Sequence, residues 1–477
     1  MAIAKSQKIA LSICGKEKEV EEALASKKTV FLPQTNLKLQ DLKAVFSIAL
    51  HMHQPLIPAD TSETPPRIIS NLEHMTKTGD EYNASVFADC YGRMGSIIPE
   101  LVNAGKNPRC MLDYSGQLFY GLKVMGREDV LERLRPIATG KHQAYAEWLG
   151  TMWGHAVASS TPPPDFKLQM RAWQQEFAAL FGFEALARVR GFSPPEMHLP
   201  NHPDVAHEYI KTLKECGYKW LLVQEHTIEA FDGGGIKEKH LPHLLVAKNS
   251  KGEEASIIAI IKTQGSDTKL VAQMQPYYEA QNLQPKEVGG ISIPQIVTQI
   301  GDGENGGVMM NEFPSGFRQA VGLFGTTGVV NVNATEYLEM IEAAGVTESA
   351  LPALRPIHQN IVLNRIKTWE PGAADRAIAE IKKENPGFCM EGGSWTNNIS
   401  WVRGYEDVLT PMNKLSAEFH AAVDGKSIST ENIEYQKALF YLLTSQTSCF
   451  RYWGQGAWTE YAKEIIRRGE EALKNLV

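Results

Sequence analysis

Residues 45–55 read VFSIALHMHQP, a short apolar run that passes directly into polar, ionisable side chains. The run 45–50 has the length and composition of a strand that is buried on both faces. His51, His53 and Gln54 follow at once, and a proline marks the end of the extended segment. Polar side chains at the exit of a buried strand are typical of a β/α barrel, in which such exits converge on one mouth.

The same pattern recurs along the chain. Apolar runs are followed by polar or glycine-containing segments, and then usually by helical periodicity. Besides 45–50, the predicted strands are 110–112, 149–153, 188–192, 219–223, 296–300 and 328–332. Alternation of strands with helices is typical of parallel β/α units. We therefore predict an α/β fold, an incomplete seven-stranded (β/α) barrel, over residues 45–344.

The segments around this barrel have a different character. Residues 231–275 contain a glycine tract and two strand patterns, which we interpret as an insertion. Beyond about residue 340 amphipathic helical patterns dominate, so 345–477 is predicted to be a helical domain. Residues 1–44 are an N-terminal extension to which the sequence assigns no role. One barrel helix can be placed closely, because Asp165 offers a cap after three prolines and Gly182 ends the apolar periodicity.

The composition sets limits on the partners. The chain of 477 residues carries 55 acidic and 48 basic side chains, a formal net charge of −7, and it has no basic block that would mark a surface for nucleic acid or an anionic membrane. Its apolar runs fall far short of the roughly 20 residues that span a bilayer, and no secretion signal is recognised. The six cysteines lie far apart without a C-x-x-C pair. We expect a cytoplasmic protein with a small polar partner; its oligomeric state is not predicted.

Ionisable residues also follow the other predicted strands. Asp113 and His155 each come soon after such a run, the segment SPPEMH spans 193–198, and GDGENGG spans 301–307. Because the strand exits of a barrel converge, the carboxylates of the last two segments are expected at one mouth.

Three of these segments form an ordered set. His51-x-His53-Gln54-Pro55, Pro195-Glu196 and Asp302-Gly303-Glu304 resemble, in order and spacing, the motifs of glycoside hydrolase family 57 (GH57). A later stretch around Trp395 resembles a further motif, which the helical domain of that family contributes to the cleft. Members of the family act on α-glucans and include α-amylases, 4-α-glucanotransferases and branching enzymes. The resemblance implies an enzyme that acts on α-1,4-glucan or maltooligosaccharides without a cofactor, with residues 345–477 completing the cleft.

The resemblance also implies roles for two carboxylates: Glu196 is the nucleophile and Asp302 the general acid/base of a retaining mechanism. Such a mechanism needs two carboxyl groups about 5–5.5 Å apart, one to attack the anomeric carbon and one to protonate the leaving oxygen. Glu304 would bind substrate, and it would raise the pKa of Asp302 by like-charge repulsion if the two lie close together. The alternative is that Glu196 caps a helix and Asp302 belongs to a glycine-rich turn.

The histidines admit three interpretations. His51 and His53 alternate along an extended chain, so their side chains point to the same side. They can bind sugar hydroxyls together with Gln54, as the resemblance implies; they can form part of a zinc site; or they can be core histidines bonded to backbone carbonyls. His155 can join either of the first two arrangements. We predict the first, without a bound metal, because no spacing identifies a third metal ligand.

Tryptophans offer aromatic faces on which sugar rings stack. Trp395 and Trp453 come late in the chain, the second beside glycines that interrupt a helical pattern, and we predict that both bind substrate. The alternative for each is packing in a helical core.

Two other functions stay open. Ser193 and Pro194 differ from the residues that precede the nucleophile in many GH57 members, which allows a glucan-binding protein of the same fold with little turnover. A zinc-dependent carbohydrate hydrolase or deacetylase that uses His51 and His53 is the third hypothesis.

Overall fold

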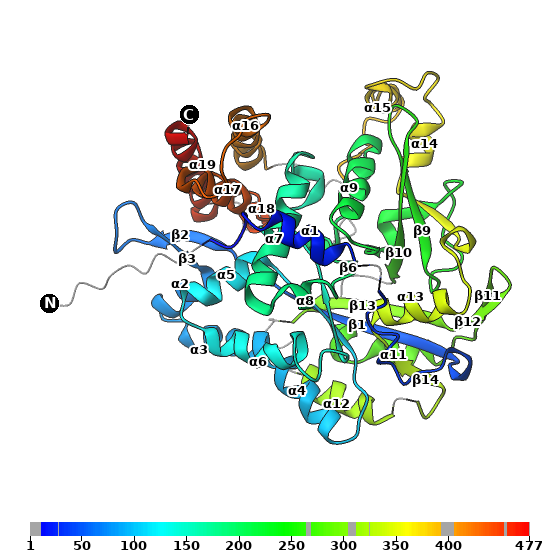
Figure 1. The fold of residues 1–477 in the computed structure, drawn as a ribbon. Helices are drawn as coiled ribbons and strands as arrows, with labels where there is room; N and C mark the ends of the chain where they lie inside the picture. Colours follow the sequence, from blue (N-terminus) through cyan, green and yellow to red (C-terminus); the bar gives the residue numbers. More distant parts are fainter. Residues whose placement is uncertain are drawn as a thin grey trace.

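The barrel is a closed ring of seven parallel strands within the described part of the chain. The computed structural model describes residues 11–26, 28–263, 269–303, 312–323, 325–392, 405–452 and 456–476. In spatial order the ring strands are β1 (Ala44–Met52), β4 (Cys110–Tyr114), β5 (Ala146–Leu149), β6 (Gly191–Phe192), β7 (Trp220–Gln224), β10 (Glu254–Lys262) and β13 (Gln295–Asp302). β13 pairs with β1 and closes the ring, and a bridge between Gly150 and Phe192 joins β5 to β6. The predicted barrel with its C-terminal helical region is confirmed (Figure 1).

The inward-facing side chains of the ring form two layers. The lower layer is apolar and buried, and it includes Ala49, Met111, Leu149, Trp220, Leu222, Ile260 and Ile300. Since side chains alternate along a strand, a residue two positions further on faces the same way. The upper layer is polar and consists of His51, Asp113, Gln224, Lys262 and Asp302. The barrel therefore has an apolar floor and a polar mouth at the carboxyl ends of its strands.

Several strands differ from the sequence-based expectation. The segment 231–275, predicted as an insertion, contains the ring strand β10, which pairs in parallel with β7 and β13. Beside it, β9 (His243–Lys248), β15 (Ala353–Pro356) and β8 (Ile228–Ala230) extend the sheet outward, so a strand occurs where only helices were expected. The predicted strand 149–153 is wrong: β5 ends at Leu149 and the apolar run continues as irregular backbone, which hydrophobicity alone does not distinguish from a strand.

Helices cover the outside of the ring. Those around the barrel are α2 (Asn71–Lys77), α3 (Glu81–Gly92), α4 (Met94–Asn103), α5 (Gly116–Val124), α6 (Glu128–Ala138), α7 (Asp165–Phe181), α8 (Phe183–Leu186), α9 (Pro203–Glu215), α10 (Lys269–Ala272), α11 (Gln275–Ala280), α12 (Phe313–Leu323) and α13 (Ala334–Ala343). Short strands complete the sheet and its hairpins: β2 (Leu56–Asp60), β3 (Arg67–Ser70), β11 (Lys286–Val288), β12 (Ile291–Ile293) and β14 (Val329–Asn331). α7 ends where predicted, before Gly182, whose φ of 90° suits glycine.

The prediction that Asp165 caps α7 is wrong. Its side chain instead connects the barrel with the C-terminal helices. It lies inside the first turn of α7 and is fully buried. Its carboxylate oxygens lie 2.7 Å from Ser416 Oγ, 2.7 Å from His420 Nε2 and 2.5 Å from Gln446 Nε2. The hydrogen bond to Asp165 raises the pKa of His420, which strengthens this connection when the imidazole is protonated.

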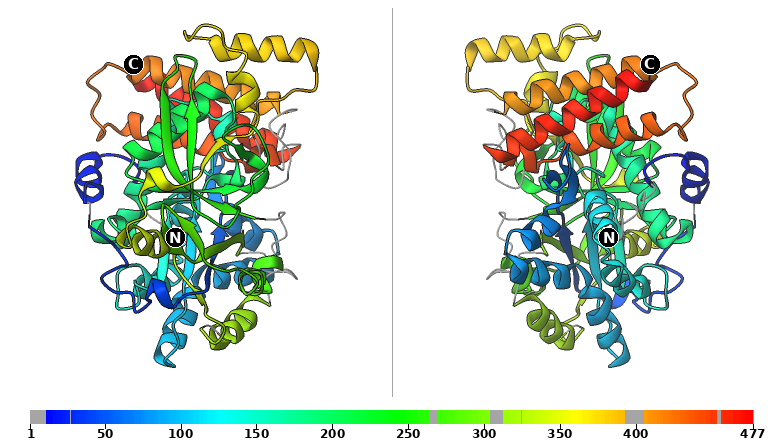
Figure 2. Two further views of the ribbon diagram at one scale, coloured as in Figure 1. Left: turned by 90° about the vertical axis from the view of Figure 1, so that its right-hand side faces the viewer. Right: turned by 90° about the vertical axis from the view of Figure 1, so that its left-hand side faces the viewer.

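The C-terminal helices form a group above the barrel. They are α16 (Glu406–Val423), α17 (Ile433–Ser445), α18 (Cys449–Tyr452) and α19 (Ala457–Leu476), drawn in orange to red in Figure 2. The smaller pair α14 (Gln359–Leu363) and α15 (Ala373–Glu384) lies by the β9–β10 hairpin, where Ala374 N donates to Ser250 Oγ at 3.0 Å (Figure 1). Among the described helices, none combines the length and the apolar character that a membrane span requires.

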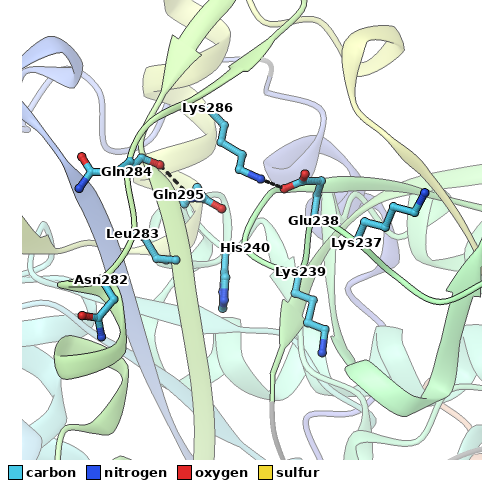
Figure 3. Close-up of a pocket in the computed structure, with 9 residues that line it drawn as sticks. All are labelled: Lys237, Glu238, Lys239, His240, Asn282, Leu283, Gln284, Lys286 and Gln295. Carbon is cyan, nitrogen blue, oxygen red and sulfur yellow. Dashed lines mark hydrogen bonds and ion pairs between the residues drawn. The ribbon is translucent and has the colours of Figure 1, made fainter.

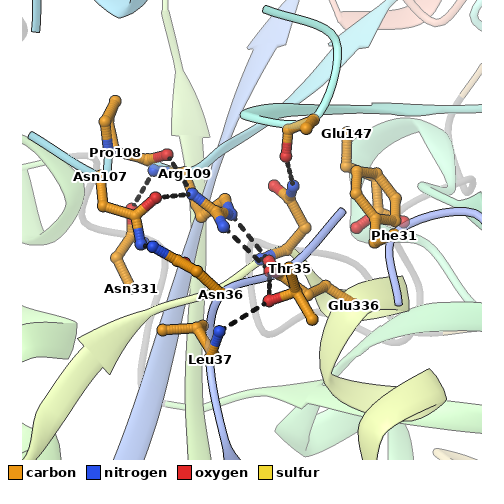
Figure 4. Close-up of polar contacts among 12 residues, drawn as sticks. Phe31, Thr35, Asn36, Leu37, Asn107, Pro108, Arg109, Glu147, Asn331 and Glu336 are labelled. Carbon is orange, nitrogen blue, oxygen red and sulfur yellow. Dashed lines mark hydrogen bonds and ion pairs between the residues drawn. The ribbon is translucent and has the colours of Figure 1, made fainter. Parts of the chain in front are cut away.

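Part of the N-terminal extension is fixed to the amino end of the barrel. Its helix α1 (Glu17–Leu24) packs against α7 and α8. Glu339 on α13 accepts hydrogen bonds at 2.5, 2.8 and 2.9 Å from the backbone N–H groups of residues 30–32. Thr35 donates to Glu336 at 2.6 Å, and the same carboxylate forms a buried ion pair at 2.8 Å with Arg109, just before β4 (Figure 4). The described part of this extension therefore packs as part of the barrel.

Glu147 on β5 gives the stability of this region a testable pH dependence. It accepts a hydrogen bond from Thr335 N at 3.0 Å, and burial raises its pKa from about 4.5 to about 7. The folded protein thus holds the proton more tightly than the unfolded chain, so the contribution of Glu147 is complete below pH 4.5 and is lost as the pH rises through 7. The Glu147→Gln variant should lack this decline, which amounts to about 3 kcal/mol in the free energy of unfolding.

Urea unfolding of the wild type and Glu147→Gln at pH 5 and pH 8 measures this difference. The exposed Glu132→Gln on α6 is the control, and it should follow the wild type. Parallel pH dependence of wild type and Glu147→Gln would contradict the prediction.

Candidate active site

A chain of hydrogen bonds crosses the mouth of the barrel through two histidines. His51, near the end of β1, places Nδ1 2.8 Å from Asp113 Oδ2 and Nε2 3.0 Å from His155 Nε2. His155 follows β5, and its Nδ1 lies 2.7 Å from Ser448 Oγ. Ser448 immediately precedes α18, so the chain connects two barrel strands with the C-terminal helices.

His53 stacks on this chain. Its ring lies 4.0 Å from that of His155 at an interplanar angle of 12°. His53 Nδ1 is 2.7 Å from Ser115 Oγ, and Nε2 is 3.4 Å from both Thr447 Oγ1 and Cys449 Sγ. Burial, together with neighbouring histidine charges, lowers the pKa of His53 and of His155 well below the ordinary value, so both rings are neutral at neutral pH.

The ring nitrogens are directed at protein partners. The Nδ1 atoms of His51, His53 and His155 face Asp113, Ser115 and Ser448 respectively. A zinc ion needs lone pairs that converge on one point, whereas two of these rings are stacked face to face. Across the described ranges, His, Cys, Asp and Glu form no group of three or more that would hold a metal ion.

Glu196 lies in a strained turn beside His155. The turn η3 (Pro195–Met197) holds Glu196 at φ 58° and ψ 20°, and Met197 and His155 also have positive φ, 49° and 56°. Non-glycine residues adopt this left-handed region at a cost, and such residues cluster at active sites. Glu196 Oε1 lies 3.8 Å from His155 Nδ1, and its side chain is 14% exposed. The carboxylate therefore faces the histidine chain.

Asp302 ends β13 at the same level of the barrel. In the sheet His51 is paired with Asp302 on one side and with Asp113 on the other. Asp302 is accessible to solvent. The protein atoms around its carboxyl group nevertheless displace part of the hydration water, and this loss raises the pKa of that group. The charge of Asp113 also raises this pKa, and His51 opposes the rise.

The other predicted site residues fall into two groups. Gln54 is buried and accepts a hydrogen bond from Asn71 Nδ2 at 3.0 Å, which directs its carbonyl oxygen toward the start of α2. Glu304, Trp395 and Trp453 lie outside the described residues. The structure therefore brings together His51, His53, His155 and Glu196 and places Asp302 beside His51.

Sequence reasoning missed several residues of this cluster. Asp113, the next-to-last residue of β4, was noted at a predicted strand exit but was given no role, and Ser115, directly after β4, could have been identified by the same rule. Ser448 and Arg451 come from the C-terminal helices, where no spacing connects them with the barrel. Arg451 is only 1% exposed, and burial lowers its pKa to about 10, against the opposing charge of Glu196.

A separate cavity lies away from these residues (Figure 3). It has a volume of about 340 Å³ and is lined by Lys237, Glu238, Lys239, His240, Asn282, Leu283, Gln284, Lys286 and Gln295. Lys286 pairs with Glu238 across it. Gln295 begins β13, whose other end carries Asp302, so the cavity is not part of the candidate active site.

Comparison with known proteins identifies the fold. No protein-family model and no curated protein sequence matches the chain. The 4-α-glucanotransferase from Thermococcus litoralis matches with a TM-score of 0.56 and 15% identity, over 90% of this chain and 60% of its own length. A GH57 branching enzyme from Thermococcus kodakaraensis matches with a TM-score of 0.57 and 14% identity, over 91% of this chain and 89% of its own.

An α-amylase from Thermotoga maritima matches with a TM-score of 0.53 and 9% identity, over 91% of this chain and 93% of its own. The chain thus spans less than two thirds of the glucanotransferase but most of the other two proteins. At such identities the likeness concerns the fold alone. The protein therefore has a GH57-type fold, as its sequence motifs indicated.

Proposed function

We propose that the protein is a retaining enzyme that acts on α-1,4-glucan or maltooligosaccharides, as a hydrolase or a 4-α-glucanotransferase. The observation that carries this proposal is the position of two carboxylates at one barrel mouth: Glu196 contacts His155, and Asp302 pairs in the sheet with His51, to which His155 is hydrogen-bonded. The GH57-type fold supports the substrate class, because the matching structures include a glucanotransferase, a branching enzyme and an α-amylase.

In this mechanism Glu196 attacks the anomeric carbon while Asp302 gives its proton to the leaving oxygen, and the glycosidic bond breaks. The glycosyl-enzyme is then attacked by water or by a sugar hydroxyl. The proton of that nucleophile passes to Asp302 as the bond to Glu196 breaks, which restores both carboxyl groups. The raised pKa of Asp302 favours its protonated form at the first step.

The histidines fit a role in binding and orientation. His51 is held between Asp113 and His155, and His53 is held by Ser115 and by its stacking on His155, so the rings are fixed before substrate arrives. Sugar-hydroxyl contacts of these three histidines and of Gln54 stay a prediction from the sequence, because their ring nitrogens and the Gln54 carbonyl oxygen bond protein groups in the structure. Glu304, Trp395 and Trp453 remain substrate-binding predictions from the sequence.

Incubation with maltoheptaose tests the proposal. A hydrolase should yield shorter maltooligosaccharides, and a transferase should yield both shorter and longer ones, whereas a glucan-binding protein without turnover leaves the chromatogram unchanged. An unchanged chromatogram with saturable maltoheptaose binding in calorimetry would replace the enzyme hypothesis by the binding one.

Removal of metals is expected to leave this activity unchanged. The nucleophile in the proposed mechanism is a carboxylate, whereas a catalytic zinc would supply the attacking hydroxide itself. The measurement is the rate of maltoheptaose consumption before and after dialysis against a strong chelator. A loss of activity that added Zn²⁺ restores would favour the zinc-dependent hypothesis.

A further inference from the structure

The backbone around His155 is held from two sides. His155 itself has a φ of 56°, a left-handed conformation that persists in a non-glycine residue only where surrounding contacts fix it. Its carbonyl oxygen accepts a hydrogen bond at 3.1 Å from Ser448 N, in the connection between α17 and α18. On the other side, Gly154 N donates at 2.7 Å to Oε1 of Gln169 on α7. The place of the His155 ring therefore depends on α7 and on the C-terminal helices together.

A chain of buried amides gives the Gln169 side chain a single orientation. A carboxylate accepts hydrogen bonds but cannot donate them, so Gln446 presents its NH₂ group to Asp165, at 2.5 Å. Gln446 Oε1 then accepts from Gln169 Nε2 at 2.8 Å, and the same nitrogen donates to the carbonyl oxygen of Leu443 at 3.2 Å. Gln169 Oε1 is thereby directed at Gly154 N. The side chains of this chain of contacts are at most 1% exposed, so its order is fixed away from solvent.

Gly154 provides a steric reason for the same arrangement. A Cβ atom at this position would lie 2.2 Å from the carbonyl oxygen of Leu443, so only glycine lets the end of α17 approach this closely. Figure 1 shows α17 and α18 next to α7. Asp165 and Gln169 stand four residues apart on α7 and share the helix face that contacts Gln446. Docking of α17 and placement of this backbone segment thus depend on the same contacts.

We propose that Gln169 is a positioning residue for His155: its amide fixes the backbone at residues 154 and 155 and thereby the ring that lies beside Glu196. The inference rests on the proposed function, in which this ring is the neighbour of the nucleophile. His155 Nδ1 lies 3.8 Å from Glu196 Oε1, and His155 Nε2 lies 3.0 Å from His51 Nε2. A shift of the backbone would displace both contacts, and a displacement of about 1 Å in an active site can lower a rate by about 100-fold.

The Gln169→Met variant tests this, because methionine fills a similar space without an amide. Gly154 N then loses its acceptor, so kcat for maltoheptaose should fall by about 10- to 100-fold. The control is Gln174→Met: Gln174 is equally buried on α7, but it bonds Arg171 and the carbonyl oxygen of Cys216. Both variants should have a lower melting temperature, and only Gln169→Met should lose kcat. Equal losses of kcat in the two variants, or wild-type kcat in a folded Gln169→Met, would overturn the inference.

A second variant gives a pH-dependent readout that a merely structural role would not produce. In Gln169→Glu the introduced carboxyl group, when protonated, can accept from Gly154 N and donate to Gln446, whereas its ionised form has no proton to donate. The ratio of variant kcat to wild-type kcat should therefore rise as the pH falls, and the ratio for Gln174→Glu should stay constant. A constant ratio for Gln169→Glu would contradict the assignment, and this readout holds even if Gln169→Met does not fold.

Hydrogen exchange separates this inference from the proposed function, because it needs no turnover. Mass spectrometry of the peptide that contains Gly154 and His155 should show faster amide exchange in Gln169→Met than in the wild type and in Gln174→Met. Unchanged exchange would overturn the role of Gln169 whether or not the protein is an enzyme. If exchange is faster but the wild type leaves maltoheptaose unchanged, the proposed function fails, while the role of Gln169 in holding His155 is supported.

Discussion

Glu196→Gln is expected to lower turnover of maltoheptaose by several orders of magnitude and to leave the fold intact. Glutamine keeps the shape of the side chain in the strained turn at φ 58° but cannot attack the anomeric carbon. Initial rates measure the loss, and circular dichroism with thermal unfolding checks the fold. A matched control is Glu225→Gln, because Glu225 follows β7 at a neighbouring strand exit and pairs with Lys239.

Glu225→Gln should keep activity within a few-fold of the wild type. A Glu196→Gln enzyme that retains a tenth of wild-type activity would remove Glu196 from the role of nucleophile, because a missing nucleophile costs far more than tenfold.

Asp302→Asn is expected to be nearly inactive on maltoheptaose and partly active on a maltosyl substrate with a good leaving group. Such a leaving group departs without protonation, so the first step no longer needs an acid. The raised pKa of Asp302 predicts that the basic limb of the wild-type kcat/KM profile reports loss of its proton, so the limb should disappear in the variant. The measurement is the pH profile on both substrates.

Asp113→Asn is the informative comparison for this prediction. The charge of Asp113 raises the pKa of Asp302, but Asp113 also bonds His51, so this variant should alter the basic limb without removing it. Equal losses of activity by Asp302→Asn on both substrates would argue against the acid/base assignment.

The barrel could be predicted because it rests on local patterns. Buried strands appear in the sequence as apolar runs of strand length. The polar residues that follow these runs identified Glu196, Asp302 and the three histidines as candidate site residues. The sequence could not show in this way which strands belong to the ring. The apolar pattern of β10 would be the same in an insertion as in the ring. Only its pairing with β7 and β13 shows that it belongs to the ring.

Contacts between segments that lie far apart in the sequence could not be predicted either. Asp165 looks like a helix cap in the sequence, because local spacing cannot show that Ser416, His420 and Gln446 surround it. Arg451 likewise lies in a helical pattern. Such a pattern predicts that the helix has an apolar face, but it does not show which part of the chain packs against that face. The sequence motifs thus locate the barrel side of the candidate site, and the helical side depends on tertiary packing.

The most direct test of the central claim is capture of the glycosyl-enzyme. Asp302→Asn lacks the base for the second step, so α-maltosyl fluoride, whose leaving group needs no acid, should load the enzyme faster than water releases it. Mass spectrometry of the intact protein should show one added maltosyl group, and digestion should place it on the peptide that contains Glu196. Consumption of the fluoride with no adduct, or with the adduct on another residue, would contradict a retaining mechanism through Glu196.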